Sequence, residues 1–295
     1  MEEKGIRTKE EYLAQIKEGK LLNPRIDSTF KAMFTQNTEE SRGALKSFLE
    51  AVVGRGISTL SIESNNAPIG FVGQRDVNYD ILCKFEDGQI ANIEMQAYNQ
   101  NYDYGNRAEY HVARLETTYL NKGDGWDSVP QVYQINVANF IYGMKGDIRA
   151  NTDSVVSYFA MRTKDGRELA NRMNVILIEL PKVEKLLDSI ETNTALENWA
   201  IYLSYADIPS KRGLIERLTE KEKGLMDAQV SLTTISENKE YWINQFRQET
   251  RERDIYSGLQ AAEKKGRLEE RNIIYKKLLD SGMSEKEISE ILGTD

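Results

Sequence analysis

Apolar and polar residues alternate along two neighbouring segments, 77–85 and 89–97, and this period of two predicts two β-strands. Between them, residues 86–88 read Glu-Asp-Gly, which is typical of a tight turn. The two strands and the turn therefore predict a β-hairpin.

Spacings of three and four between apolar residues predict helices elsewhere, and β-branched runs predict further strands. The helical spacing covers 30–52, 103–120, 183–190, 195–205 and 211–223. The strand-like runs cover 57–62, 132–142, 155–161 and 174–180. Strands interleaved with helices early in the chain, followed by helices alone, predict an α/β or α+β core.

The C-terminal part of the chain has a different pattern. Residues 247–272 carry seven basic and six acidic side chains with few large apolar ones, as in an exposed helix or coiled-coil-like arm. Ser284 and Glu287 form a capping box that begins a last short helix after a Ser-Gly turn. We therefore expect one domain over 1–236, and a helical arm with a helix–turn–helix-like hairpin over 237–295.

The amino-acid composition mainly excludes classes of protein and of binding site. With 39 Lys and Arg against 47 Asp and Glu, the net charge is −8, which argues against a broad basic surface for nucleic acid. One cysteine excludes an internal disulfide framework, and one histidine excludes a His-rich metal site. The N-terminal residues lack the apolar run of a signal peptide, and no apolar stretch is long enough to span a bilayer. We expect a cytoplasmic protein without a membrane partner.

Two carboxylates meet on the hairpin if its turn has three residues. Paired residue numbers then sum to 174, which places Ile81 opposite Ile93 and Asp80 opposite Glu94. Carboxylates directly opposite each other repel unless a cation lies between them. Mg²⁺ is a natural candidate because it prefers oxygen ligands. The alternative is a solvated sheet face that carries scattered charge.

The spacing of these acidic residues resembles a known nuclease motif. Asp80, separated by thirteen residues from Glu94-Met95-Gln96, is similar to the D-(x)n-(D/E)-x-K core of the PD-(D/E)XK nucleases. More narrowly, the chain resembles the Rpn-type recombination-promoting nucleases, also called PD-(D/E)XK nuclease family transposases. The resemblance covers about residues 20–145, through Asp27-x-x-Phe30-Lys31-x-x-Phe34, Asp80-Ile81, Asn92-Ile93-Glu94-Met95-Gln96, Arg107-x-x-Tyr110, Tyr119, Gly123 and Ile135.

This resemblance implies an α/β fold with a restriction-endonuclease-like core, in which helices flank a mixed central sheet, plus a C-terminal helical arm. It implies that Asp80 and Glu94 bind Mg²⁺ or another divalent cation, with the backbone carbonyl of Met95 as a third ligand. Gln96 stands where the superfamily has a lysine. Glutamine can orient a water molecule by hydrogen bonding, but it brings no positive charge to the leaving phosphate.

Two residues of the first matched helix have two interpretations each. Asp27 is either a further metal ligand or the N-cap of the helix. Lys31 either supplies the positive charge that Gln96 lacks or is an ordinary solvated lysine.

Three residues at positions i, i+3 and i+7 share one face of the helix predicted over 103–120. Arg107, Tyr110 and Arg114 can bind phosphates or stack on bases there, or they can form an arginine–carboxylate network around a packed tyrosine. His111 lies beside that face, and we expect a structural rather than a catalytic role for it.

The leading hypothesis is a metal-dependent DNA endonuclease associated with recombination, mobile elements or defence. In it, Asp80 and Glu94 hold the cation, Gln96 positions the attacking water, and Arg107 contacts phosphate. The acidic net charge then implies local, salt-sensitive DNA contact. One alternative is a catalytically inactive nuclease fold that binds DNA or protein. Another is an oligomeric adaptor that self-associates through the C-terminal helical arm.

Overall fold

The computed structural model describes residues 8–64, 75–98, 103–120, 122–143 and 153–293. The chain divides into two compact units, Met1–Gln245 and Phe246–Asp295, and we describe each by itself. The boundary expected between residues 236 and 237 stays a prediction.

The first unit is built on a six-stranded sheet with the order β1-β2-β3-β4-β6-β5. The pairs β1–β2, β2–β3 and β5–β6 are antiparallel, whereas β3–β4 and β4–β6 are parallel. The sheet is therefore mixed, as predicted. The strands are β1 Leu60–Ile62, β2 Ile81–Phe85, β3 Ile90–Gln96, β4 Val132–Ala138, β5 Val156–Ala160 and β6 Met173–Glu179.

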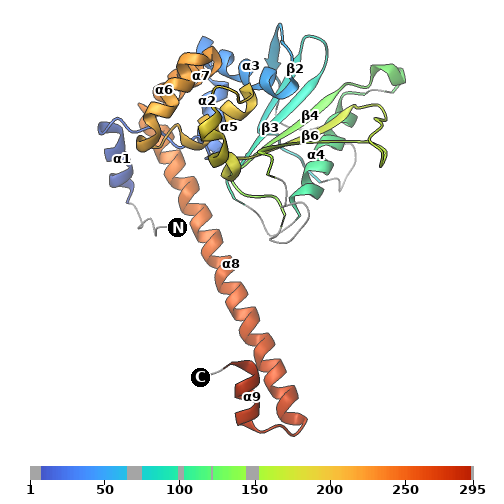
Figure 1. Ribbon diagram of the computed structural model, residues 1–295, viewed down its shortest axis with the longest axis vertical. Helices are drawn as coiled ribbons and strands as arrows, with labels where there is room; N and C mark the ends of the chain where they lie inside the picture. The colour runs from blue at the N-terminus through green and yellow to red at the C-terminus, as the bar shows by residue number, and fades with distance from the viewer. Residues whose placement is uncertain (1–7, 65–74, 99–102, 121, 144–152, 294–295) are drawn as a thin grey trace. The chain divides into compact units, whose positions relative to one another are not determined.

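Helices flank this sheet and confirm the α/β class (Figure 1). The α-helices of this unit are α1 Lys9–Lys17, α2 Asp27–Thr35, α3 Glu39–Val53, α4 Tyr104–Thr118, α5 Ala195–Tyr205, α6 Arg212–Lys221 and α7 Lys223–Ser236. Short 3-10 helices occur at η1 Trp126–Ser128, η3 Leu180–Ser189 and η4 Pro209–Lys211. Helices α2, α3, α5 and α7 pack around a core that includes Trp199, Phe34 and Phe48.

Helix α4 connects β3 to β4 and covers the sheet. Val112 and Leu115 on this helix pack with Leu82 and Ile90 of the hairpin. A helix that joins two parallel strands returns across the face of their sheet, because the second strand must start at the same end as the first. The connection places the middle of α4 over the polar side chains of β3, which determines the environment of the site.

Three details of the helices differ from the prediction. The helical spacing over 30–52 is split between α2 and α3, since Gln36 is extended and the Thr38 side chain accepts a hydrogen bond from the Ser41 amide to begin α3. The segment predicted as a helix over 183–190 belongs to the 3-10 helix η3, which has Pro181 near its start. Helix α7 was not predicted, although its buried Leu225, Ala228, Leu232 and Ile235 follow a helical spacing.

The second unit consists of helices. Helix α8, Lys239–Asp280, starts in the first unit and continues through the second, and α9 spans Glu285–Leu292. Gly282 takes a φ of 91° in the turn between them, a conformation that favours glycine. The predicted capping box is confirmed, because Ser284 and Glu287 bond each other's backbone amides. No helix among the described residues is long and apolar enough to cross a membrane.

Candidate active site

The hairpin has the predicted register. Ile81 pairs with Ile93, and the three-residue turn closes with a 2.8 Å hydrogen bond from the Phe85 amide to the Gln89 carbonyl. Gly88 has a φ of 83°, which a residue with a side chain rarely adopts. The parity of apolar positions therefore identified the correct turn length.

Regular pairing with β3 begins at Ile81, one residue after Asp80, and this corrects the strand predicted from residue 77. Strand β2 begins at Ile81, and Asp80 lies in a bend. Its Oδ2 accepts a 3.3 Å hydrogen bond from the amide of Met95. The Asp80 carboxylate thus takes the place on β3 that a continuing strand would occupy, and it lies at an end of the ladder rather than within it.

The polar side chains of β3 are buried, so the interpretation as a solvated sheet face is wrong. Asn92 and Glu94 are 0% and 1% exposed. Asn92 Nδ2 donates to Glu94 Oε1 at 3.1 Å and to Gln134 Oε1 on β4 at 2.9 Å. The reason is that β3 is an inner strand and α4 covers its polar face.

Glu94 is the centre of a hydrogen-bonded cluster beneath α4. His111 Nδ1 lies 2.6 Å from Glu94 Oε1, and the Arg107 guanidinium lies 3.2 Å from Oε2. Burial alone would raise the pKa of Glu94, but the hydrogen bond from His111 and the charge of Arg107 hold that pKa below its usual value. The Glu94 carboxylate is therefore kept ionised in the interior.

Asp80 lies in the opposite electrostatic situation. Burial, together with the negative charges of Asp27 and Glu94, raises the pKa of Asp80 to about 7, although Lys31 acts against this shift. Lys31 Nζ lies 2.9 Å from Asp80 and 3.2 Å from Asp27. Lys31 therefore faces two carboxylates, and the negative charge of a third carboxylate, Glu94, also acts on Asp80.

Asp27 is not the N-cap of its helix. The cap position is Ile26, no side chain caps the helix, and Asp27 is the first helical residue. The Asp27 side chain pairs with Lys31, which follows it by four residues and therefore lies on the same face of α2. The N-cap interpretation is wrong, and a role as metal ligand stays a prediction.

The three residues predicted to share a face of α4 have different surroundings. Arg107 turns inward and bonds Glu94 and, at 3.4 Å, Gln96 Oε1. Tyr110 is 37% exposed, and its hydroxyl donates to the Arg75 carbonyl. The charge of Arg114 acts on Tyr79, where it opposes the larger effect of burial on the Tyr79 pKa. Arg107 is thus the member of this set placed at the carboxylates.

Sequence reasoning missed the contact between His111 and Glu94. The available signal was its spacing: His111 follows Arg107 by four residues and therefore lies one turn further along the same face. A second missed feature is the polar row on β4, in which Gln134 Nε2 donates to Asn136 Oδ1 at 2.9 Å. Tyr104 donates to the same oxygen at 2.8 Å, so α4 is also hydrogen-bonded to this row.

One comparison with known proteins gave a match. A family model described as PD-(D/E)XK nuclease family transposase matches residues 24–262. The chain belongs to this family. The match includes every candidate site residue and extends beyond the residues that carried the resemblance in the sequence. Searches of curated proteins and of solved structures gave no significant match.

PD-(D/E)XK nucleases generally use divalent metal ions, and the carboxylate oxygens of Asp80 and Glu94 are of the donor type that such an ion prefers. Among the described residues, no group of three or more His, Cys, Asp or Glu side chains is arranged to hold a metal ion, so a site in this arrangement would have at most two such ligands. The amide and the carbonyl of a residue in an antiparallel pair point toward the same neighbouring strand. The Met95 amide donates to Asp80, so the Met95 carbonyl points to the same side of β3 as Asp80. Two carboxylates and one carbonyl leave positions for water and phosphate oxygens, as Mg²⁺ requires.

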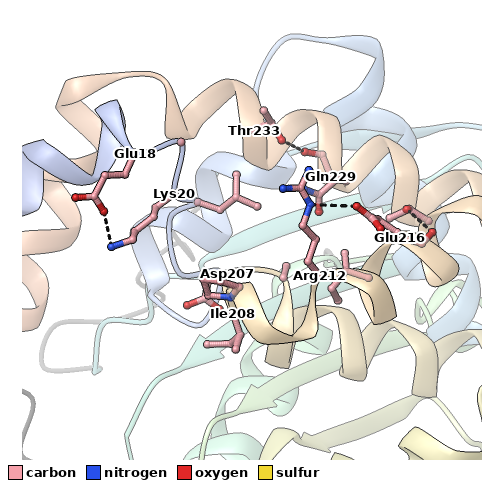
Figure 2. A pocket seen from close by; sticks show the side chains of 14 residues that line it. Glu18, Lys20, Asp207, Ile208, Arg212, Glu216, Gln229 and Thr233 are labelled. Carbon is pink, nitrogen blue, oxygen red and sulfur yellow. Dashed lines mark hydrogen bonds and ion pairs between the residues drawn. The ribbon is translucent and has the colours of Figure 1, made fainter.

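A separate pocket of about 680 Å³ lies among α6, α7 and the segment that follows α1 (Figure 2). Arg212 pairs with Glu216 and Lys20 with Glu18 within the lining, and Asp207 pairs with Arg25. None of the residues predicted for the active site lines it, and we assign it no function.

Proposed function

We propose that this member of the PD-(D/E)XK nuclease family transposases is a metal-dependent DNA endonuclease that hydrolyses phosphodiester bonds. The observation that carries the proposal is the half-buried Asp80 carboxyl, directly before β2. There, the charges of Asp27 and Glu94 and the burial of the carboxyl raise the pKa of Asp80 to about 7. A site with surplus negative charge favours a divalent cation.

In this proposal Asp80 and Glu94 hold Mg²⁺ or a similar ion, together with the Met95 carbonyl. Asp27, whose charge acts on Asp80, is the candidate for a further ligand of the same ion. A divalent cation in such a site stabilises charge on the phosphoryl group and activates water. The His111 hydrogen bond keeps the Glu94 carboxylate oriented and ionised for this purpose.

Gln96 replaces the lysine of the superfamily, so the positive charge must come from elsewhere. Its Nε2 donates to Glu94 Oε2 at 3.4 Å, which places the amide beside the proposed ion site, where it can orient water. Lys31 and Arg107 are the cations nearest to the two carboxylates in the described contacts. We assign the phosphate-facing charge to them.

The proposed substrate is DNA, and the proposed location is the cytoplasm. The net charge of −8 is compatible with this substrate because a bound cation and a few arginines can hold the backbone locally. Tyr110 and Arg114, on the same helix as Arg107, would extend this contact along the strand. We keep both as candidate substrate-binding residues.

Supercoiled plasmid DNA provides the direct test. We expect the wild-type chain to nick it in Mg²⁺ or Mn²⁺, and Asp80→Ala to lose at least about 100-fold of this activity, because the cation loses a ligand. Asp87→Ala is a matched control at the other end of the hairpin, where Asp87 pairs with Arg55. Full activity of Asp80→Ala, or no cleavage by wild type in any divalent metal, would contradict the proposal.

A catalytically inactive binding module is the second candidate. It is favoured by the neutral Gln96 and by the protein cations already paired with both carboxylates. This candidate expects DNA to bind but to stay intact in every metal. It also expects calorimetry with divalent cations to show no binding that depends on Glu94.

Self-association is proposed for the helical arm. Trp242 and Gln245 are buried, and the Gln245 amide oxygen accepts a 2.9 Å hydrogen bond from the Asn23 amide. The start of α8 therefore belongs to the first unit, and a truncation should end after Gln245. We expect removal of 246–295 to convert an oligomer into a monomer with cleavage retained, as measured by light scattering. A truncated chain of unchanged mass would exclude the arm as the oligomerisation element.

A further inference from the structure

The oxygens of both proposed metal ligands already have partners in the protein. Glu94 Oε1 bonds His111 and Asn92, and Oε2 bonds Arg107 at 3.2 Å. Asp80 Oδ1 pairs with Lys31 at 2.9 Å, and Oδ2 accepts from the Met95 amide. A cation that coordinates these carboxylates must therefore displace an existing contact.

The partners differ in how readily they can move. The Met95 amide is part of strand β3, and the His111 side chain, on α4, is 9% exposed. The side chains of Lys31 and Arg107 are 34% and 30% exposed. Long charged side chains at the boundary with water can swing their head groups outward while their stems stay in place. The two exposed cations are thus the displaceable partners.

Lys31 and Arg107 can neutralise either the two carboxylates or a phosphate group, but not both at once. While they neutralise Asp80 and Glu94, they are not available to a phosphate group. Once a divalent ion takes over the carboxylates, it also repels both side chains, because like charges this close together repel. A nearby phosphate then offers them a new anionic partner.

We infer that Lys31 and Arg107 are resident counter-ions of the metal site, displaced by the divalent cation and transferred to the DNA backbone. This inference rests on the proposed function and adds a coupling to it. Metal binding releases the phosphate-binding groups, and phosphate binding removes the competitors of the metal. Each ligand must then tighten the binding of the other by the same factor.

Calorimetry with Ca²⁺ and the full-length chain tests the first half. Lys31→Gln and Arg107→Gln remove a competing charge, so we expect each to bind Ca²⁺ about two- to fivefold more tightly than wild type. Lys31→Arg keeps the charge and should keep the wild-type affinity. Lys46→Gln is the matched control, since Lys46 forms a similar i,i+4 pair with Glu50 on α3.

Binding of a short duplex DNA with and without Ca²⁺ tests the second half, with the integrity of the DNA checked on a gel. We expect Ca²⁺ to tighten wild-type DNA binding about tenfold, and this gain to shrink toward unity in Lys31→Gln and Arg107→Gln. Weaker or unchanged Ca²⁺ binding by both variants would overturn the inference and make these residues supports of the carboxylates.

The outcomes also separate this inference from the proposed function. If wild type binds Ca²⁺ and Asp80→Ala does not, the metal site stands, and only the variants decide on counter-ion exchange. If wild type binds no divalent cation, both proposals fail together. A melting curve of each variant shows whether its fold is intact before the affinities are compared.

Discussion

We expect Glu94→Gln to abolish the proposed cleavage and also to destabilise the folded protein. The Glu94 carboxylate is 1% exposed and bonds His111 at 2.6 Å and Arg107 at 3.2 Å. Glutamine has the same shape but no charge, and its NH2 group cannot accept a hydrogen bond. The buried cluster therefore loses charge-assisted hydrogen bonds. We expect a loss of about 2 kcal/mol, or about 4–8 °C in melting temperature.

The pH dependence of this loss follows from the lowered pKa of Glu94. A carboxyl whose folded pKa lies below its unfolded pKa of 4.5 contributes stability above pH 4.5, and this contribution disappears as pH falls through the folded pKa. The melting difference between wild type and Glu94→Gln should therefore be full at pH 7 and shrink in acid. Thermal melts of the metal-free proteins across this range provide the measurement.

Glu179→Gln is the matched control for this prediction. Glu179 is 1% exposed, pairs with Lys182 at 2.6 Å, and accepts a hydrogen bond from the Tyr142 amide at 2.8 Å. It is as buried and as well paired as Glu94, but it lies outside the proposed metal site. The control should lose stability and keep cleavage. Equal cleavage by the two variants would contradict the role of Glu94.

The elements that were predictable depend on local pattern. The hairpin register follows from parity alone, because a shift by one residue would move every apolar side chain to the other face. Helix α5 has the predicted bounds, Ala195–Tyr205, because Thr194 and Glu197 form a capping box before a densely apolar run. In both cases neighbouring residues contain all the necessary information.

The features that were not predictable depend on residues far apart in the chain. The alternating polar positions of β3 are typical of an exposed face, and only the return of α4 over the sheet buries Asn92 and Glu94. The same return brings His111 onto Glu94, seventeen positions earlier in the sequence. The contact of Lys31 with Asp80 likewise joins α2 to the start of β2, across forty-nine positions.

Burial of polar groups explains why the composition was a weak guide to the site. A lone histidine or lysine usually has a structural or solvated role. The composition does not show which histidine or lysine contacts a carboxylate in the folded chain. The environment of Asp80 is decided by two carboxylates and a lysine from other elements. The electrostatics of the site are therefore a property of the tertiary structure, whereas the identity of its acidic residues was visible in the motif.

We expect Asp80→Asn to abolish the proposed cleavage, as Glu94→Gln should, but to stabilise the metal-free protein. The pKa of Asp80 is raised from 3.8 to about 7 by burial and by the charges of Asp27 and Glu94. Folding therefore favours the protonated acid. The stability of the wild type falls as pH rises from about 4 to 7, and the full penalty is present above pH 7. Asparagine removes this penalty because it carries no charge.

The expected gain at pH 8 is about 2 kcal/mol, or about 4–8 °C, since the variant also deprives Lys31 of one of its two partners. Well below the unfolded pKa of 3.8, wild type and Asp80→Asn should melt together, because Asp80 is then protonated in both the folded and the unfolded chain. Asp87→Asn, on the half-exposed turn of the same hairpin, serves as the control without such a gain. If Asp80→Asn were less stable than wild type at pH 8 in the presence of a chelator, the Asp80 carboxylate would be a stabilising member of the fold. The surplus of negative charge that argues for a metal at this site would then not exist.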